Sequence, residues 1–529
     1  MTSIEAAPAA RVAERAAAAE RRTPGDLLPV RVFIGALIAL LAGYMFMGRG
    51  FAHIGVGPIF LGEVVLAIGL VATAYAVVRL GLRPFRSIVV GLLVLFMVVG
   101  LVRTIPYIGV YGTDALRDAV LWGYAFFALF IYLLADRAWL SGALRVYGLI
   151  VAIFALWLPI AFNIFLELGR DISNQTPGAI IPLVYFKAGD MTVHSVGAVA
   201  FLVLLTTAWA GLRTLAWRYV IAQPLIWTMF INGTISRGAL LGAASGLGLV
   251  LLATRRLRNW LPVALAAIIL TIALTVGPLI GPAVASLFPA TAGPEPAPGE
   301  TTPPPWWAGN RPTTIGGFVE NFGSTFTDSG DVNQVGTKRF RLEWWGKIVD
   351  YTVFGPYFLT GKGFGVNLAD DDGFQPTQDG SLRAPHNSSM TVLARMGVPG
   401  FVLWVALQGV WALGLLWAFV RNRRAGDAWL SAVSAWIFIY WFATMVVTSF
   451  DPYIEGPQGG IWFWTLFGLG LVAMRLAPQP GTTATVPLLG EKGWRESLAS
   501  FRARGGQADE PAEVEPVEPQ PGQALPRAT

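Results

Sequence analysis

Long apolar runs dominate the chain, and short polar stretches separate them. A helix that crosses the hydrocarbon core of a bilayer needs about 20 mostly apolar residues. Runs of this kind predict transmembrane helices at 28–47, 58–78, 87–104, 115–135, 143–166, 192–212, 219–235, 238–254, 260–281, 396–420, 428–449 and 460–475. We therefore expect an all-α polytopic membrane protein with about twelve spans.

Basic residues predict the orientation of these spans. Arginines occur in every second connection, at Arg79, Arg83 and Arg86; Arg137 and Arg145; Arg213 and Arg218; Arg255, Arg256 and Arg258; and Arg421, Arg423 and Arg424. Lys and Arg in short loops favour the cytoplasmic side. We therefore expect a cytoplasmic N-terminal segment, 1–27, which is too long and too charged for a signal peptide. The tail, 476–529, is rich in Pro, Glu and Gly, which predicts a disordered cytoplasmic segment.

One connection is much longer than the others. Spans 1–9 fill 28–281 and spans 10–12 fill 396–475, which leaves 282–395 between them on the extracytoplasmic side. This stretch opens with a proline-rich linker, 294–305, and continues with aromatic residues mixed with charges and glycines. Such a mixture predicts a folded, partly helical loop domain rather than a plain connector.

Composition narrows the possible functions. Hydrophobic residues make up 54% of the chain and charged residues 13%, against about 25% charged in ordinary soluble domains. There is no cysteine, which excludes disulfides, thiolate metal sites and cysteine nucleophiles. The net charge is +6, but the basic residues lie in the clusters between spans. We therefore expect no nucleic-acid partner.

His386 is the first candidate for chemistry. The chain has three histidines, and this one follows Pro385 and precedes Asn387, just before the tenth predicted span. An imidazole with an ordinary pKa near 6.5 suits a general base. The plain alternative is a surface histidine or one whose hydrogen bonds are satisfied in the core.

Arg237 and Arg341 are candidate anion ligands. Ser236 is a good N-cap for a helix that starts at Gly238, so Arg237 would stand beside free backbone N–H groups, which together form an anion site. Arg341 and Trp345 are one helical turn apart and share a face. The plain alternatives are an Arg237 side chain that reaches lipid phosphates and an Arg341 side chain on a solvated helix face.

Three further patterns are weaker. The run 360–365, Thr-Gly-Lys-Gly-Phe-Gly, lacks the spacing of a P-loop, and a turn that needs positive φ angles explains it equally well. The acidic run 370–372 predicts an exposed turn rather than a cation site. At the outer end of the fourth span, Asp114, Arg117 and Asp118 either contain a structural ion pair between Arg117 and Asp114 or line a polar cavity.

The order of these motifs resembles that of a known family. Ser236-Arg237-Gly238 starts a span, Arg341-x-x-x-Trp345 leads to Gly361-x-Gly363-x-Gly365, and His386-Asn387 precedes Gly397-Val398-Pro399-Gly400. Together they resemble the bacterial O-antigen ligase and O-antigen polymerase superfamily of membrane glycosyltransferases. The resemblance covers about 30–475 and is specific in 236–238 and 341–400, and Arg117-Asp118 matches a pattern common in such proteins.

The resemblance implies a GT-C-like fold and a role in the assembly of cell-surface polysaccharide. The donor would be a glycan on a polyprenyl pyrophosphate, transferred to a glycan, lipid or other hydroxyl acceptor on the outer face of the bacterial cytoplasmic membrane. The reaction would invert the anomeric carbon and need no cofactor and no metal.

The resemblance also implies roles for individual residues. Arg237 and Arg341 would bind the pyrophosphate, and His386 would either accept the proton of the acceptor hydroxyl or position the pyrophosphate. The other residues implied in substrate binding are Arg117, Asp118, Ser236, Trp345, Gly363, Gly365 and Asn387.

Two alternatives remain open at this level. A polysaccharide polymerase of the same superfamily would use the same residues and differ only in its acceptor. A secondary transporter or flippase also commonly has twelve spans with both termini inside, but the sequence shows no internal repeat and no matching broken helices.

Overall fold

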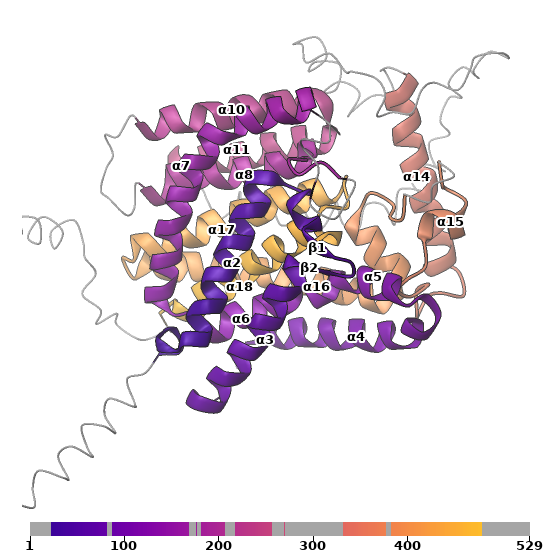
Figure 1. Cartoon of the computed structure of the whole chain (residues 1–529), viewed down its shortest axis with the longest axis horizontal. Coiled ribbons are helices and arrows are strands. Elements are labelled where there is room, and N and C mark those ends of the chain that lie inside the picture. The colour runs from indigo at the N-terminus through magenta and orange to yellow at the C-terminus, as the bar shows by residue number, and fades with distance from the viewer. Residues whose placement is uncertain are drawn as a thin grey trace, which may run out of the picture. The chain divides into compact units, whose positions relative to one another are not determined.

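The computed structural model describes residues 23–81, 87–168, 176, 181–206, 217–255, 269, 332–376 and 382–478. Within this part of the chain, eight helices are long and apolar enough to cross a membrane. These are α2 (Leu28–Met47), α3 (Leu61–Leu80), α4 (Ile88–Tyr111), α7 (Arg137–Leu168), α8 (Ala188–Ala200) with its π-helical continuation η4 (Phe201–Leu205), α16 (Ser388–Arg424), α17 (Ala428–Thr448) and α18 (Pro457–Leu476). The prediction of an all-α polytopic membrane protein is confirmed (Figure 1).

The fourth predicted span is a pair of helices. Helix α5 (Thr113–Gly123) and helix α6 (Ala125–Leu134) meet at a bend of 42° and can form a ninth span together. Helices α10 (Trp217–Ile235) and α11 (Arg237–Arg255) correspond to the seventh and eighth predicted spans but have shorter apolar stretches. The ninth predicted span, at 260–281, lies outside the described residues except for 269. The count of twelve therefore stays a prediction.

Short elements connect the helices. The first of them, η1 (Pro24–Asp26), precedes α2, and η2 (Phe51–His53) follows it. Strands β1 (Gly55–Val56) and β2 (Ile59–Phe60) then form a small antiparallel hairpin before α3. Helix η6 (Tyr453–Glu455) connects α17 to α18.

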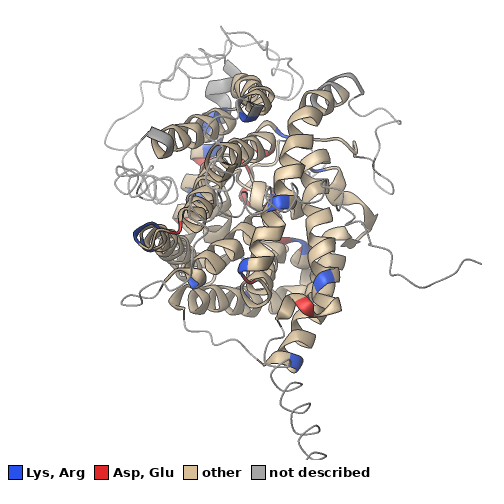
Figure 2. Ribbon diagram, turned by 90° about the vertical axis from the view of Figure 1, so that its left-hand side faces the viewer, with Lys and Arg blue, Asp and Glu red and all other residues tan. Residues whose placement is uncertain are grey.

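Close packing between helices depends on small residues, as in other membrane bundles. Gly197 of α8 lies against the ring of Tyr440 on α17, and Gly468 of α18 lies against the backbone of Ala128 on α6. In both places an added Cβ would come closer than 3.0 Å to a neighbouring atom. Figure 2 shows that few charged residues interrupt the described helices, which agrees with lipid and protein as their surroundings.

The described part of the loop domain contains two helices. Helix α14 (Val332–Thr352) packs against α16, and the short helix α15 (Leu368–Asp372) follows it along the chain. The hydrophobic core of this part of the loop domain is formed by Trp344, Trp345, Ile348, Val349, Leu368, Ala369, Met390, Leu393, Ala394 and Phe401. The loop domain therefore shares its core with the first turns of α16, and the two form one packed unit.

Helix α16 starts earlier than the apolar pattern predicts. The predicted span begins at 396, but the helix begins at Ser388 and changes direction at Gly397, which has a φ of 69°. The first part, 388–396, contains Ser388, Ser389, Thr391 and Arg395, all buried. The apolar pattern does not predict this part as helix because it contains polar residues. These polar residues are buried by protein and not by lipid.

Candidate functional site

His386 lies in a turn that three contacts hold in place. Its backbone has a φ of 55°, the one positive value for a residue other than glycine in the described part of the chain. The next residue, Asn387, caps α16: its side-chain oxygen accepts from the N–H of Ser389 at 3.0 Å and of Met390 at 3.1 Å. On the other side, Trp345 Nε1 donates to the carbonyl oxygen of Pro385 at 2.8 Å. The imidazole is therefore presented by a backbone that is fixed on both sides.

A cluster of ion pairs lies close to this turn. Arg49, just after α2, donates to Asp190 of α8 through Nε at 2.7 Å and through Nη2 at 3.2 Å. Asp451, just after α17, accepts from Arg49 Nη2 at 3.4 Å and from Lys187 Nζ at 3.3 Å. The side chain of Asp190 is 2% exposed, against 27% for Lys187. The cluster thus combines a buried carboxylate with an ammonium group that solvent can reach.

The electrostatics of the cluster extend to His386 and Arg341. Burial, followed by the positive charges of Arg341, Lys187 and Arg49, lowers the pKa of His386 to about 3, while Asp451 opposes the shift. The imidazole is therefore neutral at physiological pH, as a general base must be before it accepts a proton.

The charges of the same cluster also shift the pKa values of two of its members, Asp451 and Lys187. Burial alone would raise the pKa of Asp451, but Lys187 and Arg49 outweigh it and hold the pKa well below its ordinary value. Burial lowers the pKa of Lys187, while Asp451 opposes that shift. The carboxylate of Asp451 is therefore ionised and balances cations that burial would otherwise destabilise.

The structure also places the two predicted arginines near this cluster. The charge of Arg341 acts on both His386 and Asp451. Arg237 is the first residue of α11, and Ser236 caps this helix by accepting from the N–H of Ala239 at 3.4 Å, as predicted. The neighbouring Gly238 packs against the side chain of Phe450, next to Asp451 in the chain.

Asp118 belongs to a second, separate network. It pairs with Arg395 at 2.9 Å and with Arg383 at 3.3 Å, and it accepts from the N–H of Gly365 at 2.8 Å. The predicted ion pair between Arg117 and Asp114 is wrong. Asp114 pairs instead with Arg383 at 3.5 Å, and Arg117 lies on the exposed face of α5. This network joins α5 to the loop domain and explains Asp118 without a substrate.

The glycine-rich run is a turn rather than a phosphate cradle. Gly363 and Gly365 have φ values of 83° and 100°, which favour glycine. Their N–H groups are already used, since that of Gly363 donates to the carbonyl of Arg395 and that of Gly365 donates to Asp118. An added Cβ at Gly363 would lie 2.1 Å from the ring of Tyr107. Substrate binding by these glycines stays a prediction, and we propose close packing as their main role.

The acidic run at 370–372 divides in two. Asp370 and Asp371 are exposed, as predicted, but Asp372 is buried and accepts from Trp344 Nε1 at 2.7 Å and from Lys362. Within the described ranges, no group of three or more His, Asp or Glu side chains is arranged to hold a metal ion.

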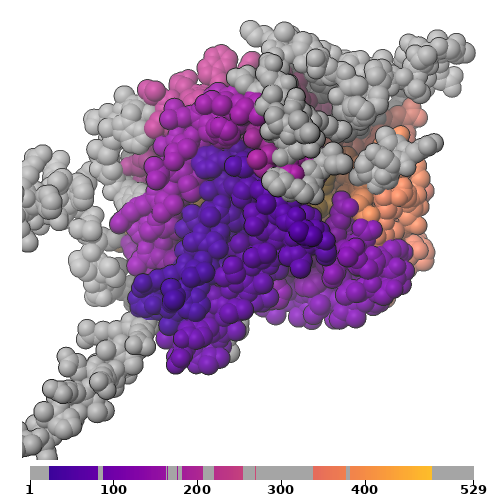
Figure 3. Space-filling view, viewed as in Figure 1, coloured from indigo at the N-terminus to yellow at the C-terminus, as the bar shows by residue number. Residues whose placement is uncertain are grey.

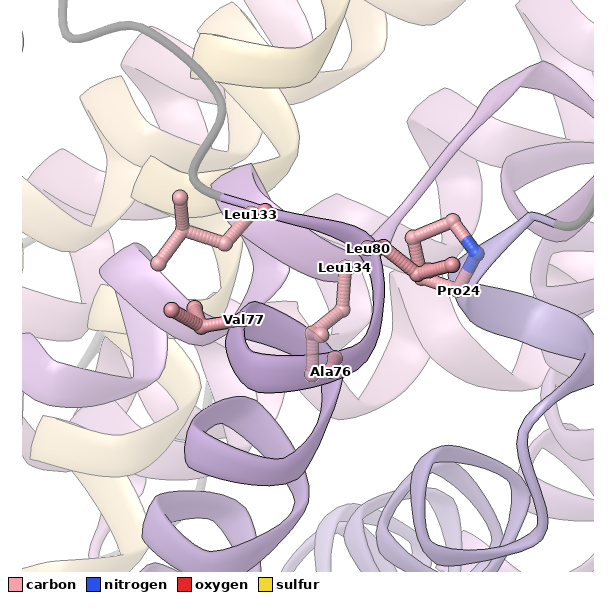
Figure 4. A pocket seen from close by; sticks show the side chains of 7 residues that line it. Pro24, Ala76, Val77, Leu80, Leu133 and Leu134 are labelled. Atoms are coloured by element: carbon pink, nitrogen blue, oxygen red, sulfur yellow. The ribbon is translucent and has the colours of Figure 1, made fainter. Parts of the chain in front are cut away.

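An apolar pocket lies away from these polar clusters (Figure 4). It forms at the last turns of α3 and α6, at the end of α3 opposite to the segment that carries Arg49, and its walls are Pro24, Ala76, Val77, Leu80, Gly81, Leu133 and Leu134. The pocket offers no charged group, so it has no part in the candidate site.

Four residues of this cluster are not predicted as site residues from the sequence: Arg49, Lys187, Asp190 and Asp451. A signal for two of them is present in the sequence. With the predicted orientation, Arg49 and Lys187 lie on the extracytoplasmic side, where basic residues are disfavoured. A basic residue at such a place indicates a specific partner.

The fold and these polar clusters describe a helical membrane protein whose charged groups gather where several helices and a loop domain meet. Residues 224–405 match the family model described as O-Antigen ligase, a range that includes Arg237, Arg341 and His386. This match supports the resemblance to the O-antigen ligase and polymerase superfamily, and with it a glycosyltransferase-like enzyme of polysaccharide assembly. A comparison with curated proteins found no match.

Proposed function

We propose that the protein transfers a glycan from a polyprenyl pyrophosphate to a hydroxyl acceptor on the outer face of the bacterial cytoplasmic membrane. The observation that carries this proposal is the convergence of a neutral imidazole, His386, with the charges of Arg341, Lys187 and Arg49. An anionic lipid-linked donor and a hydroxyl nucleophile require these two kinds of group.

The arginines would bind the donor. Arg341 and Arg237 would hold the pyrophosphate through bidentate hydrogen bonds, which a guanidinium makes better than an ammonium. Arg237 adds the positive end of α11 to this site. As the bond between the sugar and the phosphate breaks, negative charge grows on the leaving oxygen, and fixed cations stabilise that charge.

His386 would act on the acceptor. Its neutral nitrogen takes the proton of the acceptor hydroxyl while the oxygen attacks the anomeric carbon from the face opposite to the pyrophosphate. One C–O bond forms, the bond to the phosphate breaks, and the pyrophosphate leaves with the electron pair. A single displacement of this kind inverts the anomeric carbon. Asp451, close to both His386 and Lys187, stabilises the imidazolium that results.

In this scheme the charge stabilisation comes from the protein's own cations, so we propose that no metal takes part. The test is to incubate the purified protein with a lipid-linked glycan and an acceptor, with and without EDTA, and to measure released polyprenyl pyrophosphate. Release that EDTA leaves unchanged supports the proposal, whereas a strict requirement for added magnesium contradicts its metal-free form. No release with any acceptor, together with movement of the lipid-linked glycan across proteoliposome membranes, favours a flippase instead.

The same assay addresses ligation and polymerisation. A polymerase would extend the glycan on a second lipid-linked donor, so that products grow by whole repeat units. A ligase would move the glycan to an acceptor without pyrophosphate. Supplying one acceptor at a time and comparing product sizes separates the two activities. We propose ligation, on the strength of the family match over 224–405.

A further inference from the structure

A turn of the loop domain exposes four large apolar side chains. It follows α14, and we call residues 354–359 the aromatic turn. The exposed fractions are 80% for Phe354, 38% for Tyr357, 42% for Phe358 and 69% for Leu359. Exposure of apolar area to water costs about 25 cal/mol per Å², so an exposed group of this kind usually marks a contact with another molecule or a membrane.

The backbone of the aromatic turn is fixed to two membrane helices. The carbonyl oxygen of Phe358 accepts from the N–H of Val398 at 2.8 Å, at the point where α16 changes direction. The carbonyl oxygen of Thr360, the first residue after the turn, accepts from Arg103 Nη2 of α4 at 2.5 Å. Just after the turn, the N–H of Gly361 donates back to the carbonyl oxygen of Tyr357 at 2.9 Å. The apolar side chains are therefore held at one place on the protein.

This place is continuous with the apolar outer faces of the spans. Val402, one turn beyond Val398 on α16, is 58% exposed, and Leu413 and Trp417 continue along the same helix. On α4, Val102 and Ile105, on either side of Arg103 and Thr104, are 59% and 57% exposed. In Figure 3 the orange residues of the loop domain lie beside the purple residues near α4 and α5. Exposed faces of spans contact lipid, so the turn lies at the edge of the lipid-facing surface.

We propose that the aromatic turn inserts into the bilayer at the boundary between lipid headgroups and acyl chains. The occupant of this surface is thus the lipid of the leaflet that meets the loop domain. Aromatic residues are enriched at this depth because their rings combine apolar bodies with polarisable or polar edges. Insertion would fix the height of α14, which carries Arg341, above the membrane surface.

The experiment uses the natural lack of cysteine in this chain. Phe354→Cys and Leu359→Cys each carry a nitroxide label in the full-length protein in phospholipid nanodiscs. Glu343→Cys is the matched control, because Glu343 lies on an exposed face of α14 with its side chain 53% exposed. Electron paramagnetic resonance then compares collisions with oxygen, which concentrates in lipid, and with a water-soluble nickel chelate.

We expect oxygen to dominate at 354 and 359 and the nickel chelate to dominate at 343. Labels at 354 and 359 that behave like the label at 343 would show that the turn is in water and overturn the proposal. Labels shielded from both reagents would show a protein contact, such as a second copy, and would overturn it too. None of these outcomes depends on transferase activity. The experiment therefore tests membrane insertion independently of the proposed function.

Discussion

Trp345 donates a hydrogen bond from its indole nitrogen to the carbonyl oxygen of Pro385 and so joins the helix of Arg341 to the turn of His386. The two candidate groups are separated by more than 40 residues in the chain, yet a single contact of 2.8 Å fixes their supports relative to each other. Trp345, predicted as a substrate ligand, is 8% exposed, so we propose that it acts mainly by positioning the site.

Trp345→Phe should test this positioning role. Phenylalanine keeps most of the buried ring but loses the hydrogen bond, which contributes about 0.5–1.5 kcal/mol. We expect turnover to fall by up to about tenfold with little change in donor affinity. Trp344→Phe is the matched control, since it loses the comparable bond to Asp372, away from His386. Equal loss of turnover in both variants would show a general effect on folding instead.

Arg341→Lys and Arg237→Lys should each lose most activity. Lysine keeps the positive charge but lacks the planar fork that binds two phosphate oxygens at once. Turnover and binding of a lipid-linked donor should both be measured, with Arg339→Lys as a control, because the Arg339 side chain is 79% exposed. If both site variants insert normally into the membrane and keep near-normal activity, neither arginine is needed to bind the pyrophosphate.

His386→Gln should keep donor binding and lose about 10² to 10⁴ in rate, the usual contribution of positioned proton transfer. A parallel loss of binding and turnover would instead show that His386 anchors the pyrophosphate.

The pH dependence separates the same two roles of His386. Burial, followed by the nearby cations, lowers the pKa of His386 to about 3. The value of kcat/KM, which reports the protonation states of the free enzyme, should therefore not fall between pH 7 and about pH 5 through protonation of His386. A bound dianionic donor raises the pKa in the complex, so kcat should rise with pH and then level. A kcat that falls as pH rises would contradict the role of His386 as a general base.

Glu455→Gln should change how stability depends on pH. Burial raises the pKa of Glu455 to about 7, although hydrogen bonds from Ser388 and Thr391 and the charge of Arg395 oppose the shift. A raised pKa means that the folded protein binds the proton more tightly, so this group favours the fold below its ordinary value of 4.5 and loses that contribution as pH rises through 7.

The measurement for Glu455 is the thermal unfolding midpoint in detergent from pH 5 to pH 8. We expect the wild-type midpoint to fall more over this range than that of Glu455→Gln. Glu343→Gln, a change at an exposed site, should follow the wild type. Parallel curves for all three proteins would show that Glu455 does not titrate in this range.

The predicted orientation can be tested with single cysteines. Glu343→Cys in the loop domain should react with an impermeant maleimide in spheroplasts, and Arg423→Cys at the end of α16 should react only after permeabilisation. Both positions are exposed, so access to the reagent depends on the side of the membrane. Labelling at 423 in sealed spheroplasts would reverse the orientation.

The spans could be predicted well because hydropathy depends on local sequence. The first apolar run predicts 28–47, and α2 spans Leu28–Met47. The start of α16 could not be predicted in this way, since its first polar turns are stabilised by the Asn387 cap and by burial against the loop domain. Sequence shows which residues are apolar, but it does not show whether protein or lipid will cover them.

The site could be predicted only in part for a similar reason. His386 and Arg341 stand out because charged and titratable residues are rare near the spans. Asp451 does not stand out, because its importance comes from Arg49, which is 402 positions away in the chain. Likewise, Gly365 resembles a phosphate ligand until the structure shows that Asp118 accepts its N–H. Long-range partners decide these roles, and they are not visible in local sequence.

The left-handed backbone conformation at His386 affects which residue evolution would favour at this position. A residue with a side chain gives up about 1 kcal/mol or more in this conformation, and glycine would adopt it without that loss. Selection for stability alone would therefore favour glycine between Pro385 and Asn387. The strain is compensated by the helix cap on one side and the indole bond on the other. The fold thus gives up stability at the position from which His386 interacts with the cations.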